Sequence, residues 1–292
     1  MAFWQKFYRP NTVDEALAAL ASAPGPAWPI AGGTDLILDL QQGKKPPLHT
    51  LVDLTSVHEM TALEVRAGKL FIGAAAPLNH IVASPLVQTH ASGLVEAAAL
   101  IAGPQVRNTA TLGGNVVHAL PAADGTIALL VCEPQVEIAS RQGRRFLQLA
   151  ELFSGPGESI IHSQRELVVG FHVPLRAAHQ ASAFRRIMRA QGIALPILNC
   201  SIWLERSAGS FADVRIAVGP GGPTPWRAAA AETVLRGKPY STPLVQQAEQ
   251  ALLAEVHFRT SAYRASAAYR TELVRTLLHD TLQTAWQRAE TA

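Results

Sequence analysis

The first 58 residues combine one helical pattern of apolar positions with two short apolar runs. Apolar residues recur at helical spacing from Thr12 to Leu20, and this segment opens with a threonine followed three residues later by a glutamate, which is typical of a helix start. The runs Trp28 to Ala31 and Leu51 to Leu54 indicate buried strands, and Leu36 to Gln42 between them is expected to be a helix. Because a parallel strand pair needs a crossover connection, this order predicts a small parallel βαβ lobe at residues 1–58.

Residues 59–174 form a second predicted lobe, in which alternating strand patterns flank helical segments. Leu63 to Arg66 and Lys69 to Gly73 predict a hairpin around an Ala-Gly turn. Two helices should follow, the second capped by Ser84 and running as far as Ile101. The other segments expected in this lobe are a glycine-punctuated loop at 103–115, a short helix at 121–130, and antiparallel strands at 136–140, 144–149 and 166–172.

Residues 175–292 have a different pattern and predict a third lobe. Phe184 to Met188, Leu198 to Glu205 and Ala212 to Val218 show the alternation of three antiparallel strands. Three helices are expected next, at 226–236, 243–257 and 261–289, the last with apolar residues every three to four positions. The chain is therefore predicted to be an α+β protein, with two α/β lobes followed by a lobe that has a three-stranded antiparallel sheet and a three-helix bundle.

The composition excludes several classes of protein. Of the 292 residues 48% are hydrophobic and 16% are charged, which is typical of a soluble globular chain and indicates either a surface partly covered by partner subunits or simply an alanine-rich sequence. The net charge is +3, but the arginines are scattered and no aromatic residues interleave with a basic run, which disfavours nucleic-acid binding. Because the start lacks the apolar core of a signal peptide and no run of about 18 apolar residues occurs, we expect no membrane span and a cytoplasmic location.

Cysteines, histidines and short motifs limit the chemistry further. Cys132 and Cys200 lie in apolar strings and are therefore expected to be buried, inert thiols. Two cysteines are too few for an iron–sulfur cluster, which usually takes four such ligands. No two of the ten histidines have the i, i+4 spacing of a helical zinc site, and no Walker, Gly-x-Ser-x-Gly or Rossmann glycine motif appears. The sequence thus predicts no metal centre, and no residues are predicted to be catalytic.

Two stretches with paired glycines offer a binding site instead. Pro29 to Asp35 and Thr111 to Asn115 each end an apolar approach with Gly-Gly and a small polar residue. Glycine can take φ > 0 and lay main-chain N–H groups against a ligand, and successive N–H groups bind a pyrophosphate well, with help from a following helix N-terminus. Either stretch alone can be an ordinary turn. Thr34 and Asp35 can in addition cap the helix that follows.

With these motifs in place, the sequence resembles the FAD-binding subunit, or medium chain, of the molybdenum hydroxylases, the xanthine dehydrogenase and carbon monoxide dehydrogenase family. The resemblance covers essentially the whole chain. Its specific parts are Ala31 to Asp35, Arg107 to Asn115 and Pro121 to Asp124, with weaker similarity at Gly219 to Arg227 and Arg264 to Arg270. It implies the PCMH-type FAD-binding fold, with the FAD pyrophosphate between the two glycine turns.

The resemblance also implies individual contacts. Asp124 matches the aspartate that bonds the adenosine ribose, Leu167 the residue on the adenine side, and Ile101 the residue that approaches the flavin. The implied FAD-binding residues are Ile30, Ala31, Gly32, Gly33, Thr34, Asp35, Ile101, Thr111, Gly113, Gly114, Asn115, Asp124, Leu167 and Arg185. From the residues alone, Asp124 can equally be an acid at a helix start, and Leu167 and Ile101 can be plain core. His118 can contact the flavin or simply pack.

The sequence departs from the family pattern in one region. A lysine is common soon after the aromatic residue at Phe184, and here Arg185 or Arg186 takes its place. The later Asp-Ile-Ala triplet is replaced by Gly192 to Ala194, with one residue missing. A guanidinium differs from an ammonium in geometry, so this contact is expected to change.

The implied function is electron transfer. In the family a molybdenum subunit hydroxylates a substrate, 2Fe-2S clusters on another chain pass electrons singly, and the flavin delivers two to NAD, oxygen or a quinone. The resemblance implies FAD on this chain, the molybdenum cofactor and the 2Fe-2S clusters on partner subunits, and a heterohexamer with two copies of each chain. Two alternatives stay open: a self-contained FAD-dependent oxidoreductase of the same fold, and a flavin-free scaffold subunit.

Overall fold

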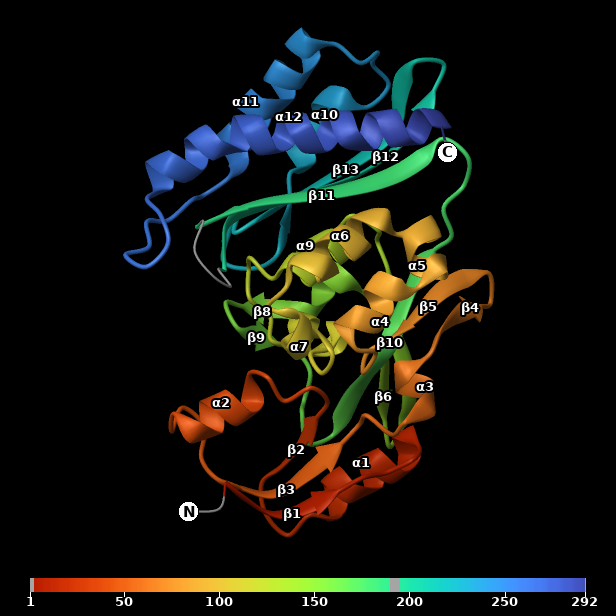
Figure 1. Ribbon diagram of the computed structural model, residues 1–292, viewed down its shortest axis with the longest axis vertical. Coiled ribbons are helices and arrows are strands. Elements are labelled where there is room, and N and C mark those ends of the chain that lie inside the picture. Colours follow the sequence, from red (N-terminus) through yellow and green to blue (C-terminus); the bar gives the residue numbers. More distant parts are fainter. Residues whose placement is uncertain (1–2, 190–194, 292) are drawn as a thin grey trace.

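The computed structural model describes residues 3–189 and 195–291 and stacks three lobes along the longest axis (Figure 1). The N-terminal lobe lies at the bottom of this view, a mixed lobe lies in the middle, and the C-terminal sheet with its long helix lies at the top. This arrangement confirms the predicted α+β class. None of the described helices combines the length and apolarity needed to cross a bilayer. The lobe boundaries at residues 58 and 174 stay predictions.

The N-terminal lobe is a three-stranded parallel sheet with two helices. Its elements are β1 (Trp4–Tyr8), α1 (Val13–Ser22), β2 (Ala27–Ile30), α2 (Leu36–Gln41) and β3 (Leu48–Asp53), and the strand order is β1-β3-β2. The parallel βαβ prediction is confirmed, whereas β1 was not predicted. Its sequence is mostly polar and aromatic, and four of its five residues are exposed, so it lacks the apolar run of a buried strand.

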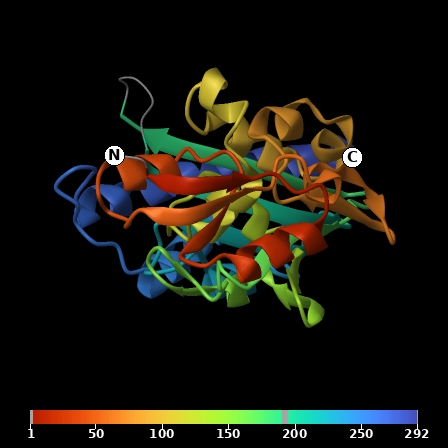
Figure 2. The same cartoon turned by 90° about the horizontal axis from the view of Figure 1, so that it is seen from below.

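The two helices of this lobe cover opposite faces of the sheet, because neighbouring residues of a strand point to opposite sides. Leu51 packs with Leu40 of α2 in a small separate core, whereas Val52 joins α1 in the main core. Figure 2 shows α1 and α2 on opposite sides of the strands. Thr12 caps α1 as predicted, since its Oγ1 accepts a hydrogen bond from Glu15 N at 3.1 Å.

The middle lobe is built on a five-stranded antiparallel sheet in the order β4-β5-β10-β6-β7. Its strands are β4 (Leu63–Arg66), β5 (Lys69–Gly73), β6 (Gln135–Ser140), β7 (Gly143–Gln148) and β10 (Glu166–Pro174), and a small hairpin is formed by β8 (Phe153–Gly155) and β9 (Glu158–Ser159). The predicted hairpin and three later strands are confirmed. Ala67 and Gly68 at the hairpin turn both have positive φ, as the tight turn requires.

The helices of the middle lobe are shorter than predicted. They are α3 (His58–Thr61), α4 (Leu78–Ala83), α5 (Pro85–His90), α6 (Ser92–Leu100), α7 (Pro104–Arg107), α8 (Leu112–Val117) and α9 (Asp124–Leu130), and a 3₁₀ helix spans Leu149–Leu152. The helix that begins after the Ser84 cap ends at His90, so its predicted extension to Ile101 is wrong. Ala91 between the two helices has a non-helical backbone, with φ of −145° and ψ of 55°, and Ser182 accepts hydrogen bonds from Ser92 Oγ and Gly93 N at the start of α6.

Two further predictions in this lobe need correction. The segment 103–115 is not a glycine loop, because it contains α7 and the first turn of α8. The helix predicted at 121–130 begins only at Asp124. The turns of α7 and α8 are too short to produce a periodic pattern.

The C-terminal lobe pairs four antiparallel strands with three helices. They are β11 (Gln180–Met188), β12 (Pro196–Ser207), β13 (Ser210–Gly219), β14 (Trp226–Arg227), α10 (Ala229–Leu235), α11 (Thr242–Glu255) and α12 (Ala267–Thr291). Three strands and three helices were predicted. The short β14 occupies the segment predicted to open the first helix, because Trp226 pairs there with Val218.

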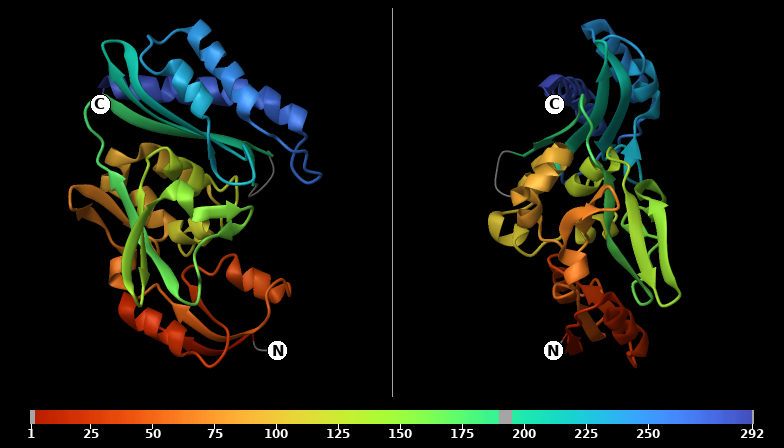
Figure 3. Two further views of the ribbon diagram at one scale, coloured as in Figure 1. Left: turned by 180° about the vertical axis from the view of Figure 1, so that it is seen from behind. Right: turned by 90° about the vertical axis from the view of Figure 1, so that its right-hand side faces the viewer.

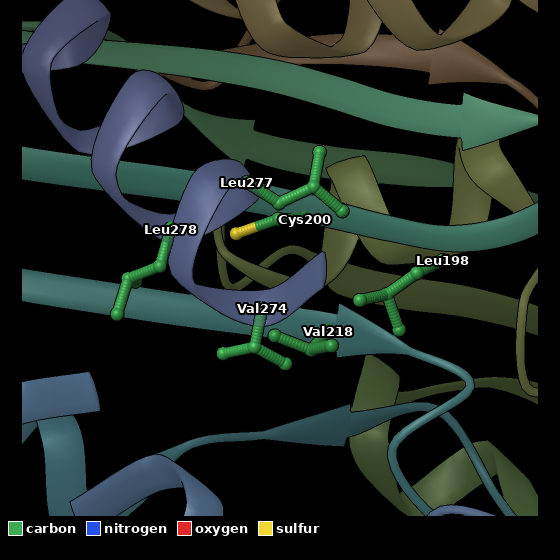
Figure 4. Close-up of a pocket in the computed structure, with 6 residues that line it drawn as sticks. All are labelled: Leu198, Cys200, Val218, Val274, Leu277 and Leu278. Atoms are coloured by element: carbon green, nitrogen blue, oxygen red, sulfur yellow. The ribbon is translucent and has the colours of Figure 1, made fainter. Parts of the chain in front are cut away.

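The C-terminal sheet is covered on both faces. Helix α12 lies along one face, and α6 and α9 of the middle lobe pack on the other (Figure 3). A pocket beneath α12 is lined by five aliphatic side chains and the Cys200 thiol (Figure 4). It is too small for a water-sized guest, and burial raises the pKa of Cys200 to about 12. Cys132 is equally buried, so both cysteines are inert core residues, as predicted.

Candidate functional site

The first glycine turn exposes a row of unused main-chain donors. It connects the end of β2 to α2, and Gly33 adopts a left-handed conformation with φ of 68°. Within the described part of the chain, no residue accepts a hydrogen bond from the N–H groups of Ala31 through Leu36. Asp35 stands at the N-cap position of α2 but makes no side-chain cap bond, so the predicted capping by Thr34 or Asp35 is not formed.

The second glycine turn uses its donors internally. Thr111 is the N-cap of α8, and its Oγ1 accepts from Gly114 N at 3.1 Å. Gly113 N donates to Ala74 O at 2.8 Å, and Asn115 N donates to Thr111 O at 3.1 Å. This stretch is therefore the first turn of a helix and not an open loop with left-handed glycines.

The structure brings the two turns together through glycine. A Cβ on Gly32 would lie 2.1 Å from Thr109 O, so the first turn touches the backbone that leads into Thr111. A Cβ on Gly113 would lie 2.5 Å from Ala74 O, which fixes the second turn against the end of the middle sheet. At Gly114 a Cβ would meet only Thr111 Oγ1, at 3.2 Å. The residues 30–35 and 111–115, predicted to act together, are thus neighbours.

Asn115 and Asp124 connect the second turn to the rest of the molecule. Asn115 Oδ1 accepts hydrogen bonds from Thr126 N at 3.1 Å and Thr126 Oγ1 at 3.3 Å, which ties α8 to α9. Asp124, the first residue of α9, is 4% exposed. Its carboxylate forms an ion pair with Arg186 and accepts from Asn199 Nδ2 at 2.7 Å. Burial raises the pKa of Asp124, and the positive charge of Arg186 opposes this shift.

The remaining predicted residues belong to other parts of the fold. Ile101 follows α6 and is half-buried, and its carbonyl accepts from Arg107 Nη1 at 3.0 Å. Leu167 on β10 is buried in the main core. Arg185 is exposed and donates to Thr284 Oγ1 of α12 at 3.2 Å. The Gly192 to Ala194 triplet lies outside the described residues.

Sequence reasoning named Arg186 only as an alternative to Arg185 and missed Asn199, and these two side chains hold Asp124. Arg186 neighbours Arg185 on β11, and successive strand residues point to opposite faces, so only one of the two arginines can face α9. Buried Phe184 two residues earlier marks that face and could have identified Arg186. Asn199 had no signal, because it lies inside an apolar strand. In the described part of the chain, no group of histidine, cysteine and acidic residues could hold a metal ion.

Comparisons with known proteins identify the class. Residues 3–176 match the family described as FAD binding domain in molybdopterin dehydrogenase, and residues 182–285 match the CO dehydrogenase flavoprotein C-terminal domain. Together with the paired turns, these matches define an FAD-binding oxidoreductase subunit.

Similar proteins agree across the whole chain. The xanthine dehydrogenase FAD-binding subunit of Escherichia coli O157:H7 is 31% identical, covering 93% of this chain and 92% of that protein. The carbon monoxide dehydrogenase medium chain of Hydrogenophaga pseudoflava is 28% identical over 97% of both chains. A solved structure of carbon monoxide dehydrogenase from that organism matches with a TM-score of 0.90 and 29% identity, over 97% of this chain and 98% of that one. The chain belongs to the family of FAD-binding medium subunits of xanthine and carbon monoxide dehydrogenases, and its cofactor is FAD.

Proposed function

We propose that the two glycine turns hold the pyrophosphate of FAD, with the first turn as the anion-binding element. The observation that carries this proposal is the row of N–H groups from Ala31 through Leu36, which have no acceptor among the described residues. Successive N–H groups at a left-handed turn form a concavity that suits phosphate oxygens. The second turn contributes shape, because Gly114 leaves open space where a side chain would otherwise stand.

The remaining site residues would position the rest of the cofactor. Ile101 and Leu167 offer apolar surface, and Asp124 would accept a ribose hydroxyl with carboxylate lone pairs that its two described partners do not use. Arg185 would serve in place of the family's lysine, although its guanidinium contacts Thr284 of α12 in this structure. Bound FAD supplies the capacity to accept electrons one at a time and release them in pairs. The protein supplies position, electrostatics and access.

We further propose the place of this chain in a complex. Electrons would arrive from 2Fe-2S clusters of a small partner subunit, after oxidation of a substrate at the molybdenum cofactor of a large subunit, and would leave to NAD, oxygen or a quinone. Two copies of each chain would form the heterohexamer, in the cytoplasm. The match to medium chains over nearly their full length supports this role.

The first test concerns the flavin site. The purified full-length chain should hold about one FAD, and Asp124→Asn should weaken FAD binding and also lower the unfolding midpoint, because the buried Arg186 guanidinium loses its counter-charge. The measurement is a fluorescence titration of FAD into the protein stripped of flavin. A wild-type chain that takes up no FAD would leave the flavin-free scaffold as the explanation.

The second test concerns the electron path. The complex purified from the native host should contain iron and molybdenum on two further subunits, and its reduced flavin should be reoxidised by one of the three acceptors. Turnover of a substrate by this chain alone, without iron or molybdenum, would instead support a self-contained oxidoreductase.

A further inference from the structure

Four arginines gather where the C-terminal lobe meets α9. Arg259 and Arg264 lie in the connection between α11 and α12, Arg270 lies in the first turn of α12, and Arg186 lies on β11. Arg270 donates to the carbonyl of Arg259, and its Nε donates to Ile197 O at 3.0 Å. We call these four residues the arginine cluster.

The like charges of Arg259, Arg264 and Arg270 act on one another. Burial and the positive charge of Arg259 lower the pKa of Arg264, and Asp124 opposes this shift. Burial and the charges of Arg264 and Arg259 lower the pKa of Arg270. The guanidinium groups therefore repel one another in a partly desolvated place.

The positive charge of the cluster is not balanced by the chain. Asp124 is the one carboxylate found beside it in the described structure, and it already pairs with Arg186. The sequence has no aspartate or glutamate from 256 to 270 or from 185 to 204, a range that includes the residues outside the structure. A group of like charges without counter-charge is unfavourable unless an anion joins it.

A buried donor next to Asp124 points the same way. The Arg186 side chain is 6% exposed, and its Nε has no partner among the described residues. Asn199 is fully buried, and its Oδ1 is likewise without a partner there. Buried donors are nearly always bonded, so the Arg186 Nε indicates a ligand or water beside it, whereas Asn199 Oδ1 is packed against Gly219.

The cluster is open to solvent on one side and has an apolar rim. Arg259 is exposed, Arg264 is half-buried, and the neighbouring Tyr263 and Tyr269 are 88% and 47% exposed. The connection between α11 and α12 lies on the same side of the molecule as α2 and the first glycine turn (Figures 1 and 3). Guanidinium forks match phosphate oxygens, and exposed tyrosine rings offer a stacking surface for a base.

We propose that the arginine cluster binds the phosphate group of a nucleotide other than the FAD held at the glycine turns. The proposal rests on the proposed function in one respect, because the single pyrophosphate of FAD is assigned to the first turn. The recognised chemistry is a phosphate ester with an adjacent ring system.

The test uses the full-length FAD-loaded chain at low ionic strength, titrated calorimetrically with inorganic phosphate, AMP and ADP-ribose. We expect both nucleotides to bind more tightly than inorganic phosphate, and Arg264→Gln to weaken their binding by about tenfold, since a charge-assisted hydrogen bond contributes that much. FAD content should not change. The matched control is Arg275→Gln on α12, an exposed arginine that pairs with Glu249, and it should leave nucleotide binding unchanged.

Three results would overturn the proposal: no binding of any probe at millimolar concentration, equal weakening by Arg275→Gln, or loss of FAD together with the nucleotides in Arg264→Gln. Inorganic phosphate binding as tightly as AMP would show a plain anion site and would also overturn the nucleotide assignment. If the wild-type chain holds no FAD at all, the proposed function fails, while the same titrations of the flavin-free chain still decide the arginine cluster.

Discussion

The two glycine turns have similar sequences but use their main-chain donors in opposite ways. In the first turn, the N–H groups from Ala31 through Leu36 find no acceptor in the described chain. In the second turn, Gly113, Gly114 and Asn115 donate to Ala74 O, Thr111 Oγ1 and Thr111 O. The difference arises from the surroundings, since a carbonyl of the middle sheet stands next to Gly113. The proposed anion site therefore belongs to the first turn, where no described protein acceptor takes the donors.

The largest effect is expected where the turns meet. Gly32→Ala places a Cβ against Thr109 O, and relieving this overlap should cost about 1–3 kcal/mol, which separates the turns. FAD binding should weaken by about 10- to 100-fold, measured by fluorescence titration. Unchanged affinity would show that contact between the turns is unnecessary for the site.

A smaller effect is expected at the left-handed glycine. Gly33→Ala should cost about 1–2 kcal/mol of backbone strain and weaken FAD binding by about tenfold, because the donors of the first turn would move. Gly43→Ala is the matched control, since Gly43 is also left-handed, with φ of 70° and no neighbour near its Cβ position. It should lose similar stability in urea denaturation and retain FAD. Equal loss of FAD affinity in both variants would show that Gly33→Ala acts only through the lower stability of the protein.

Substitution of Asn115 in the second turn should lower the stability of the protein more than its affinity for FAD. Asn115→Leu leaves the N–H of fully buried Thr126 without its acceptor, whereas the Thr126 hydroxyl can still donate to the Asn115 carbonyl, so the free energy of unfolding should fall by about 1–3 kcal/mol. FAD affinity should change by only a few-fold. Asn115→Asp keeps an acceptor oxygen and should recover most of the stability. A large loss of FAD affinity at full stability would place the Asn115 side chain in the flavin site.

The smallest effect is expected at Gly114. An added methyl group meets only Thr111 Oγ1, and φ is not left-handed, so Gly114→Ala should change the unfolding free energy by less than about 0.5 kcal/mol. The added Cβ would stand in the space that the proposed site leaves beside the pyrophosphate, so FAD affinity should fall by a few-fold and no further. If this variant behaves like Gly32→Ala, the two turns are equivalent and the contrast between them is wrong.

Local signals predicted most of the fold. The Thr12 cap, the hairpin at Ala67 and Gly68, and the Ser84 cap appear in the structure where the sequence places them. The predictions of secondary structure were wrong where contacts between distant parts of the chain decide the conformation. Trp226 of β14 pairs with Val218 of the distant strand β13, and the first turn of α6 donates hydrogen bonds to Ser182 of the distant strand β11. Neither partner can be read from the local pattern.

In the candidate site, too, local signals were predicted from the sequence and long-range contacts were not. The motifs identified the stretches that lie together, but not which donors are used, nor that Arg186 and Asn199 enclose Asp124. Only the position of β11 and β12 against α9 decides those contacts. The sequence by itself determined the family, the order of the elements and the two glycine turns, because periodicity, caps and turn residues act over a few neighbours. The tertiary structure alone decided which N–H groups remain available and which charges stay unbalanced, because both depend on atoms brought close from distant parts of the chain.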